Sequence, residues 1–329
     1  MFLLLIPGTC YVRNMICENE HHVQKKGETV RVKAQPHPKG AFVAFAIIAA
    51  ALYALSTPVS KILLAEVPGA MMAALLYLGA GAGMAVVGAV RAGVLRAAGT
   101  PSREERLALS DAPYVAAMIA LDIVAPILLM AGLSTASAES VSLLNNFEIV
   151  ATALIALLMF HEPVSKRLWV AIALITAACA LLSLDGPAGL EVTPGSLFVL
   201  AASVCWGLEN NCTNRLSAKD PLQVVVVKGF GSGTGALLVA FAAGDAFPPA
   251  ALASCALLLG FAAYGLSIFF YVHAQRGLGA ARTSAYYALS PFIGVALAWA
   301  IFQEPPNAFF IAALALMIAG VYLAAPKGD

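Results

Sequence analysis

Charged residues are scarce in this chain. Asp, Glu, Lys and Arg make up 11% of its 329 residues, whereas 61% are hydrophobic. A soluble domain carries about 25% charged residues. We therefore expect the chain to use the lipid bilayer as part of its solvent. The formal net charge of +1 provides no basic surface, so nucleic acid is excluded as a partner.

Residue types that serve catalysis or metal binding are also few. The six cysteines form no Cys-x-x-Cys pair, so neither a disulfide framework nor a zinc site is expected. The sequence has no Gly-x-x-x-x-Gly-Lys loop for ATP. Catalysis would need a nucleophile–base pair or a metal triad, and His273 is the one histidine within an apolar run. We predict no enzymatic activity and no cofactor, and keep an intramembrane enzyme as an alternative class.

What the chain has instead is a series of apolar runs of about twenty residues, each long enough to cross a bilayer. Ten are predicted, after a polar N-terminal tail at 1–40 that we expect to be cytoplasmic and disordered. The predicted spans are 41–64, 69–90, 112–133, 138–160, 167–184, 194–216, 221–243, 250–273, 281–302 and 307–325.

The basic residues predict the orientation of these spans. With the N-terminus in the cytoplasm, every Lys and Arg except Lys61 and Lys228 falls in the tail or near a loop on the inner side. The positive-inside rule then places both termini in the cytoplasm.

Two stretches of the sequence repeat each other. Ala49–Pro68 aligns without a gap with Ala202–Pro221, which places Tyr53 on Trp206. Glu162-Pro163 and Glu304-Pro305 form a second matching pair. We predict two five-helix halves, 41–184 and 194–325. Because five is odd, the halves enter the membrane from opposite sides and form an inverted repeat, with the binding site between them.

Polar residues inside the spans are the candidate site, because an ionisable group in lipid needs a compensating role. Asn145, Glu148 and Thr152 are predicted to share one helix face toward a cavity. Asp122 is predicted to pair with Lys228 by charge alone. The alternative for Lys228 is to snorkel to the membrane edge, and Glu148 could instead be a buried packing element.

The sixth span adds Trp206, Glu209, Asn210 and Asn211, and Tyr53 and Pro58 occupy the matching part of the first span. Interrupted helices at matching places in two halves are typical of transporter sites, so we expect spans one and six to be short or broken there. Tyr264 and Tyr287 are placed in the same cavity. The alternatives are a hydrogen-bond cluster between helices for the polar residues and interfacial positions for the tyrosines.

Several of these segments resemble the drug/metabolite transporter superfamily, EamA-type. The resemblance rests on the stretch from Ala125-Pro126 to Leu133, the stretch from Ala138 to Glu148, and the segments Trp206–Ser217 and Gly277–Thr283. It covers about 41–325. It implies a ten-helix inverted-repeat carrier of small metabolites, including amino acids, with Glu148 and Trp206–Asn211 at a central cavity.

The sequence thus predicts an all-α integral membrane protein with ten transmembrane helices in two inverted five-helix repeats. The predicted function is export of a small metabolite by alternating access across the inner (cytoplasmic) membrane. Its predicted partners are a small-molecule substrate and the lipid bilayer, with protons as the candidate coupling ion at Glu148, since buried carboxylates can exchange protons near neutral pH. A channel-like uniporter is the other alternative, and monomer and homodimer both stay open.

Overall fold

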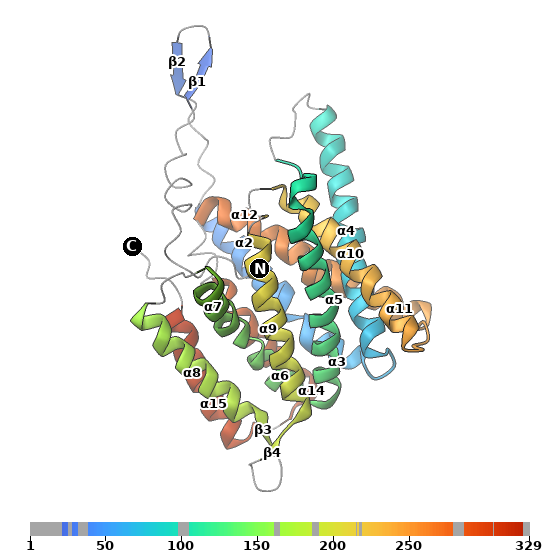
Figure 1. Ribbon diagram of the computed structural model, residues 1–329, viewed down its shortest axis with the longest axis vertical. Helices are drawn as coiled ribbons and strands as arrows, with labels where there is room; N and C mark the ends of the chain where they lie inside the picture. The colour runs from blue at the N-terminus through green and yellow to red at the C-terminus, as the bar shows by residue number, and fades with distance from the viewer. Residues whose placement is uncertain are drawn as a thin grey trace.

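The computed structural model describes residues 22–25, 28–31, 39–97, 105–160, 165–185, 191–214, 216, 219–278, 286–304 and 306–324. Most of the predicted tail at 1–40 lies outside these residues. In the described part of this tail, strands β1 (His22–Lys25) and β2 (Glu28–Arg31) pair antiparallel as a hairpin that stands apart from the helices (Figure 1).

Helices make up the body of the protein, and a second small hairpin joins β3 (Leu184–Asp185) to β4 (Glu191–Val192). The helices are α2 (Lys39–Ala54), α3 (Ser56–Leu63), α4 (Gly69–Ala97), η1 (Leu109–Asp111), α5 (Ala112–Thr135), α6 (Ala138–Leu144), α7 (Phe147–Phe160), α8 (Lys166–Ser183), α9 (Pro194–Asn214), α10 (Pro221–Ala242), α11 (Ala250–Gly260), the π-helical turn η2 (Phe261–Leu266), α12 (Ser267–Leu278), α14 (Ser290–Phe302) and α15 (Ala308–Ala324).

Six helical stretches of the described chain are long and apolar enough to cross a membrane. They are 40–63, 69–93, 109–135, 166–183, 221–242 and 250–271. Helix α9 is not among them, because Glu209 and the asparagines near it lower its hydropathy, and α14 and α15 are shorter apolar helices. The protein is an all-α integral membrane protein, and the span number of ten stays a prediction.

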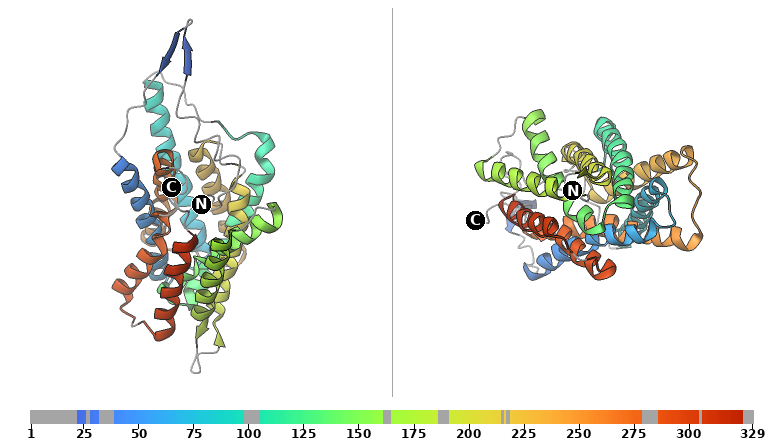
Figure 2. Two further views of the ribbon diagram at one scale, coloured as in Figure 1. Left: turned by 90° about the vertical axis from the view of Figure 1, so that its left-hand side faces the viewer. Right: turned by 90° about the horizontal axis from the view of Figure 1, so that it is seen from below.

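The helices pack in pairs that correspond when the two predicted halves are exchanged. Helix α4 packs on α10, and α8 packs on α15, so each of these pairs joins corresponding helices. The α5–α9 contact corresponds in the same way to the α12–α2 contact, and α7–α9 to α14–α2. The α8–α15 pair lies at the opposite side of the bundle from α4 and α10 (Figures 1 and 2). This pattern is the one that a duplicated architecture would produce.

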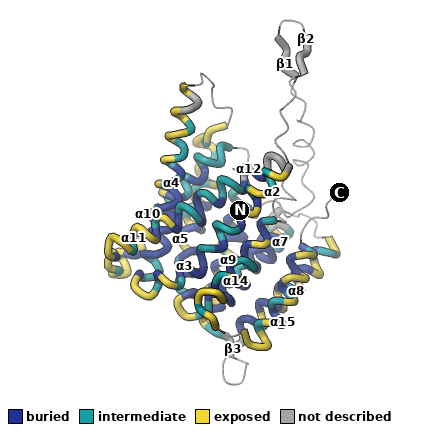
Figure 3. Tube along the Cα trace, turned by 180° about the vertical axis from the view of Figure 1, so that it is seen from behind, coloured by how far each residue is buried: buried dark blue, intermediate teal, exposed yellow. Residues whose placement is uncertain are grey.

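Burial divides the bundle into a buried interior and an exposed outer face (Figure 3). Met71, Met72, Leu75 and Leu76 of α4 are fully buried. Large apolar side chains such as Leu238 of α10 are exposed on the outside. In a membrane-spanning bundle such an outer face contacts lipid, where exposed apolar side chains are stable.

Helix α4 approaches its neighbours backbone to backbone. A Cβ atom added to Gly79 would lie 2.0 Å from the carbonyl oxygen of Leu257, and one added to Gly229 would lie 2.4 Å from the backbone nitrogen of Gly81. Only glycine permits such contacts. The small residues therefore serve close helix packing, as is common in membranes.

Three predicted spans are interrupted near their middle. The break between α2 and α3 falls at Leu55, and the break between α6 and α7 falls at Asn145–Asn146. A turn at Ala288–Leu289 precedes α14. Superposition of the two Glu-Pro pairs places this turn within one residue of the Asn145–Asn146 break, so the matched interruptions lie in spans four and nine.

These breaks correct two expectations. Spans one and six were predicted to be interrupted together, but α9 runs without a break through Trp206 and Asn211. Asn145 was predicted to share a helix face with Glu148 and Thr152, but the helix ends before Asn145 and resumes at Phe147. The i→i+3 hydrogen bond from the backbone of Asn146 to Leu143 tightens the chain there and changes its direction.

Lys61 closes the end of α5. Its ammonium donates hydrogen bonds to the backbone oxygens of Leu133 (2.6 Å) and Ala136 (2.7 Å). Carbonyl groups in the last turn of a helix lack intrahelical partners, and a lysine is well suited to satisfy them.

A set of ion pairs joins two loops that are far apart in the sequence. Lys219 contacts Glu105 and, at 3.5 Å, Asp111, and Arg91 at the end of α4 lies 3.5 Å from Asp220. We call these five residues the loop latch. It ties the connection between α4 and α5 to the connection between α9 and α10.

Candidate functional site

A small cavity of about 30 Å³ lies where the two predicted halves meet. It is large enough for roughly one water molecule. Helices α2, α4, α7, α9, α10 and the η2–α12 region all contribute to its wall. The lining residues are Tyr53, Tyr77, Ala80, Glu148, Trp206, Glu209, Asn210, Val225, Lys228, Gly229, Tyr264 and Ile268.

Lys228 lies between two buried carboxylates. Its Nζ atom is 2.9 Å from Oδ2 of Asp122 and 3.1 Å from Oε1 of Glu209. Tyr77 donates a hydrogen bond of 2.9 Å to Oδ1 of Asp122, and Thr213 donates to Glu209. The pair predicted between Asp122 and Lys228 is confirmed, and Lys228 does not snorkel to the membrane edge.

Glu148 is held by a different set of contacts. Its Oε1 atom accepts a hydrogen bond of 2.6 Å from Nδ2 of Asn210, and Asn210 also lies 3.4 Å from the hydroxyl of Thr152. None of the ion pairs among the described residues reaches Glu148. Glu148 is therefore a buried carboxyl group that an amide from α9 positions at the cavity wall.

Aromatic rings line the cavity together with Glu148. The ring of Tyr264 lies 5.9 Å from that of Tyr53 and 5.4 Å from that of Tyr77. Tyr287 extends this cluster, at 5.8 Å from Tyr53 and 4.9 Å from Tyr271. The rings of Tyr53, Tyr77, Tyr264 and Trp206 form a rigid part of the cavity wall, because aromatic side chains have few rotatable bonds and pack well at such distances.

The structure brings six of the ten predicted site residues to the cavity wall, namely Tyr53, Glu148, Trp206, Glu209, Asn210 and Tyr264. Asp122 and Tyr287 lie behind the wall, and reach the cavity through their contacts with Lys228 and Tyr53. Asn211 binds the backbone oxygens of Thr152 and Gly207, so it joins α7 to α9. Asn145 does not line the cavity, because it lies in the break between α6 and α7.

Two residues of the cavity wall, Tyr77 and Lys228, were not predicted there from the sequence. Tyr77 lies in the apolar run of α4, where its hydroxyl was the one available signal of a polar role. Its contact with Asp122 depends on the packing of α4 against α5, which no spacing along the chain reveals.

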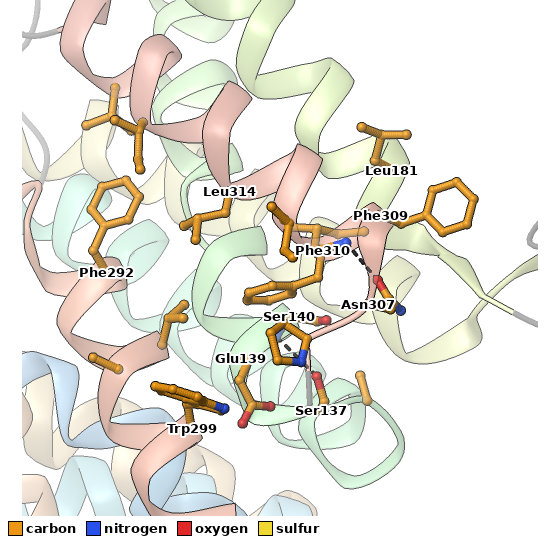
Figure 4. A pocket seen from close by; sticks show the side chains of 18 of the residues that line it. Ser137, Glu139, Ser140, Leu181, Phe292, Trp299, Asn307, Phe309, Phe310 and Leu314 are labelled. Atoms are coloured by element: carbon orange, nitrogen blue, oxygen red, sulfur yellow. Dashed lines mark hydrogen bonds between the residues drawn. The ribbon is translucent and has the colours of Figure 1, made fainter. Parts of the chain in front are cut away.

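A larger crevice of about 1560 Å³ lies between α6, α8, α14 and α15. Figure 4 shows its wall: Phe292 and Trp299 of α14, Phe309 and Phe310 of α15, and Glu139 of α6 at one end. Trp299 and Phe309 are about half exposed, so this wall opens onto the outer, lipid-facing side. The crevice contains none of the predicted site residues, and the small cavity is the better candidate for a specific site.

Two carboxylates, those of Glu209 and Glu148, line the cavity together with the ammonium of Lys228. A third carboxylate, that of Asp122, lies behind the wall and contacts Lys228. Buried charges of one sign are costly unless a counter-charge or a proton joins them. Over the described residues, no group of three or more His, Cys, Asp and Glu side chains is placed to hold a metal ion. The arrangement favours the binding of a proton or a positively charged group rather than metal chemistry.

Comparison with known proteins agrees with this architecture. A curated relative from Methanothermobacter thermautotrophicus (strain Delta H), described as an uncharacterized transporter, is 25% identical over 290 residues, with 84% of each chain covered. A protein of known crystal structure, 16% identical in sequence, has a TM-score of 0.61 over 85% of this chain and 95% of its own, which shows a shared fold.

The model of the EamA-like transporter family matches residues 40–184 and 193–325, which together make up most of the sequence. The resemblance noted from the sequence is thereby confirmed. The chain belongs to the EamA-like transporter family.

Proposed function

We propose that this transporter is a secondary carrier that moves a small metabolite across the inner membrane by alternating access. The observation that carries the proposal is the small cavity between the two predicted halves, with the buried side chains of Glu148 and Asn210 in its wall. A cavity of about 30 Å³ is too small for a metabolite, so the substrate would enter a more open form. This closed arrangement is what a carrier passes through between its two open states.

In this proposal the direction is export and the substrate is a small metabolite, with amino acids among the compounds to be tested. Both termini lie in the cytoplasm, as the distribution of Lys and Arg predicts. Impermeant thiol reagents applied to intact cells test the orientation. They should label a cysteine that replaces Glu66, in the first outer loop, and should not label one that replaces Asp220.

Counterflow in liposomes tests the carrier function. Purified protein is loaded with an unlabelled metabolite panel, and uptake of each labelled compound is measured against Glu148→Gln. Saturable exchange that is lost in Glu148→Gln is expected. Glu139→Gln is the matched control, because Glu139 is also a buried carboxylate but lies in α6 away from the cavity. Equal loss in both variants would contradict the assignment of the site, and no exchange of any compound would contradict the carrier function.

Proton coupling forms a separate part of the proposal. Glu148 would carry the proton, since it is buried and forms no ion pair with the described residues around it. An imposed pH gradient should then drive net flux in the parent protein and fail to do so in Glu148→Gln. Flux in the parent protein that is indifferent to the gradient would contradict proton coupling and leave facilitated exchange as the mechanism.

A further inference from the structure

The distribution of charge in the cavity distinguishes among classes of small metabolite. Lys228 is the cation of the cavity wall among the described residues, and it is already shared by Asp122 and Glu209 at 2.9 and 3.1 Å. Those two carboxylates receive further hydrogen bonds from Tyr77 and Thr213. An incoming carboxylate would therefore have to compete for a lysine that two buried partners hold.

The surroundings of Glu148 differ from those of Lys228. Among the described residues, Glu148 accepts one hydrogen bond, from the neutral amide of Asn210 at the cavity wall, and no ion pair reaches it. A positive group of a ligand would supply the counter-charge that this buried carboxylate lacks among the described residues, and the attraction between opposite charges is strong where water is scarce.

The rest of the wall suits the same ligand. Tyr53, Tyr77, Trp206 and Tyr264 line the cavity together with Glu148. The negative face of an aromatic ring attracts a cation, and ammonium groups are recognised by cages of such rings. Val225 and Ile268 add apolar surface, which favours a carbon skeleton next to the charge.

From this geometry we infer that the site takes organic monocations that bear an ammonium group and no carboxylate. The inference rests on the proposed carrier function and narrows its substrate class. The ammonium lies against Glu148 and the aromatic wall, and the apolar part of the molecule contacts Val225 and Ile268. Zwitterionic amino acids are disfavoured, because their carboxylate would add a negative charge beside Asp122, Glu209 and Glu148.

A set of matched probes tests the substrate class by binding alone. Choline and benzyltrimethylammonium are permanent cations, glycine betaine adds a carboxylate to a quaternary ammonium, and 3,3-dimethylbutan-1-ol is the neutral isostere of choline. Trp206 can report binding, because the chain has three tryptophans and Trp169 and Trp299 are both exposed on the lipid-facing surface. In a Trp169→Phe/Trp299→Phe background, titration of the detergent-solubilised full chain measures the fluorescence of Trp206.

At least one of the two cations should change the fluorescence of Trp206 saturably, while glycine betaine and 3,3-dimethylbutan-1-ol should not. Glu148→Gln should weaken cation binding by about 10- to 100-fold, because the cation loses its negatively charged partner. Glu139→Gln should leave it unchanged. Betaine or the neutral isostere binding as tightly as the cations, cation binding that survives in Glu148→Gln, or no response to any probe would each overturn the inference.

Counterflow of the same probes separates this inference from the carrier function. Exchange of an amino acid without exchange or binding of a cation would overturn the substrate class and leave the carrier function intact. Saturable binding of a cation at Glu148 without counterflow of any compound would support the site and overturn the carrier function.

Discussion

Replacement of Lys228 by methionine tests the ion cluster at the centre of the molecule. Lys228 lies 2.9 Å from Asp122 and 3.1 Å from Glu209, and the two acidic residues are 0% and 1% exposed. At an effective dielectric constant of about 20, each of these attractions is about 5–6 kcal/mol. The desolvation of the three charges offsets much of this gain, so the intact cluster contributes little net stability.

Loss of the lysine removes both attractions and leaves the desolvation of two carboxylates uncompensated. Removing one partner of a buried pair typically costs about 3–5 kcal/mol. We expect Lys228→Met to lower the melting temperature of the detergent-solubilised protein by about 4–7 °C. Thermal melts followed by size-exclusion chromatography measure this change, with the parent protein at the same detergent concentration.

A triple variant provides the control. Lys228→Met combined with Asp122→Asn and Glu209→Gln removes all three charges at nearly constant side-chain volume, so it should recover most of the lost melting temperature. A single Lys228→Met variant that melts within about 2 °C of the parent would refute the reasoning. It would show that the two carboxylates are neutral or solvated when the lysine is absent.

Three further predictions concern packing, a helix end and the loop latch. Gly79→Ala should lower stability by about 1–3 kcal/mol, because its methyl group would lie 2.0 Å from a carbonyl oxygen of α11. Gly93→Ala should not, because a Cβ atom there would meet nothing within 4 Å. Equal melting temperatures of the two variants would contradict the contact at Gly79. Lys61→Met should cost about 1.5–3 kcal/mol in the same melts, because two carbonyl groups at the end of α5 lose a charged donor, and a neutral result would mean that water replaces it. Lys219→Met should open the loop latch and accelerate maleimide labelling of Val225→Cys in the cavity wall by about two- to fivefold. About 1 M salt should have the same effect in the parent protein. An unchanged labelling rate in both experiments would show that the latch does not control access to the cavity.

Hydropathy was sufficient to predict the class of fold and where most helices lie. Every predicted span contains a helix in its described part, because the length of an apolar run is set by the thickness of the bilayer. The break at Asn145–Asn146 was not predictable in the same way. The break contains no proline, and asparagine is also found within regular helices of other proteins. The interruption therefore depends on the neighbours that α6 and α7 meet.

The contacts within the candidate site were likewise predicted only in part. Charge sign alone paired Asp122 with Lys228, because two opposite charges in lipid have few other partners. The second partner, Glu209, needed the three-dimensional packing of α9 against α5. Asn211 shows the opposite error. A polar residue in a span was expected at the cavity, but its amide serves instead as a hydrogen-bonded link to α7.

The pairing of α4 with α10 and of α8 with α15 has a mechanical consequence. A rotation that interchanges two similar halves leaves in place any pair made of corresponding helices, so a twofold axis would pass through both contacts. At the α4–α10 contact, Gly81 and Gly229 touch backbone to backbone, and the spacing there has no slack to change. In the proposed transport cycle, this contact would stay fixed while the other helices move around it. Spin labels on α4 and α10 would keep a constant separation, whereas the α5–α9 distance would lengthen as the α12–α2 distance shortens.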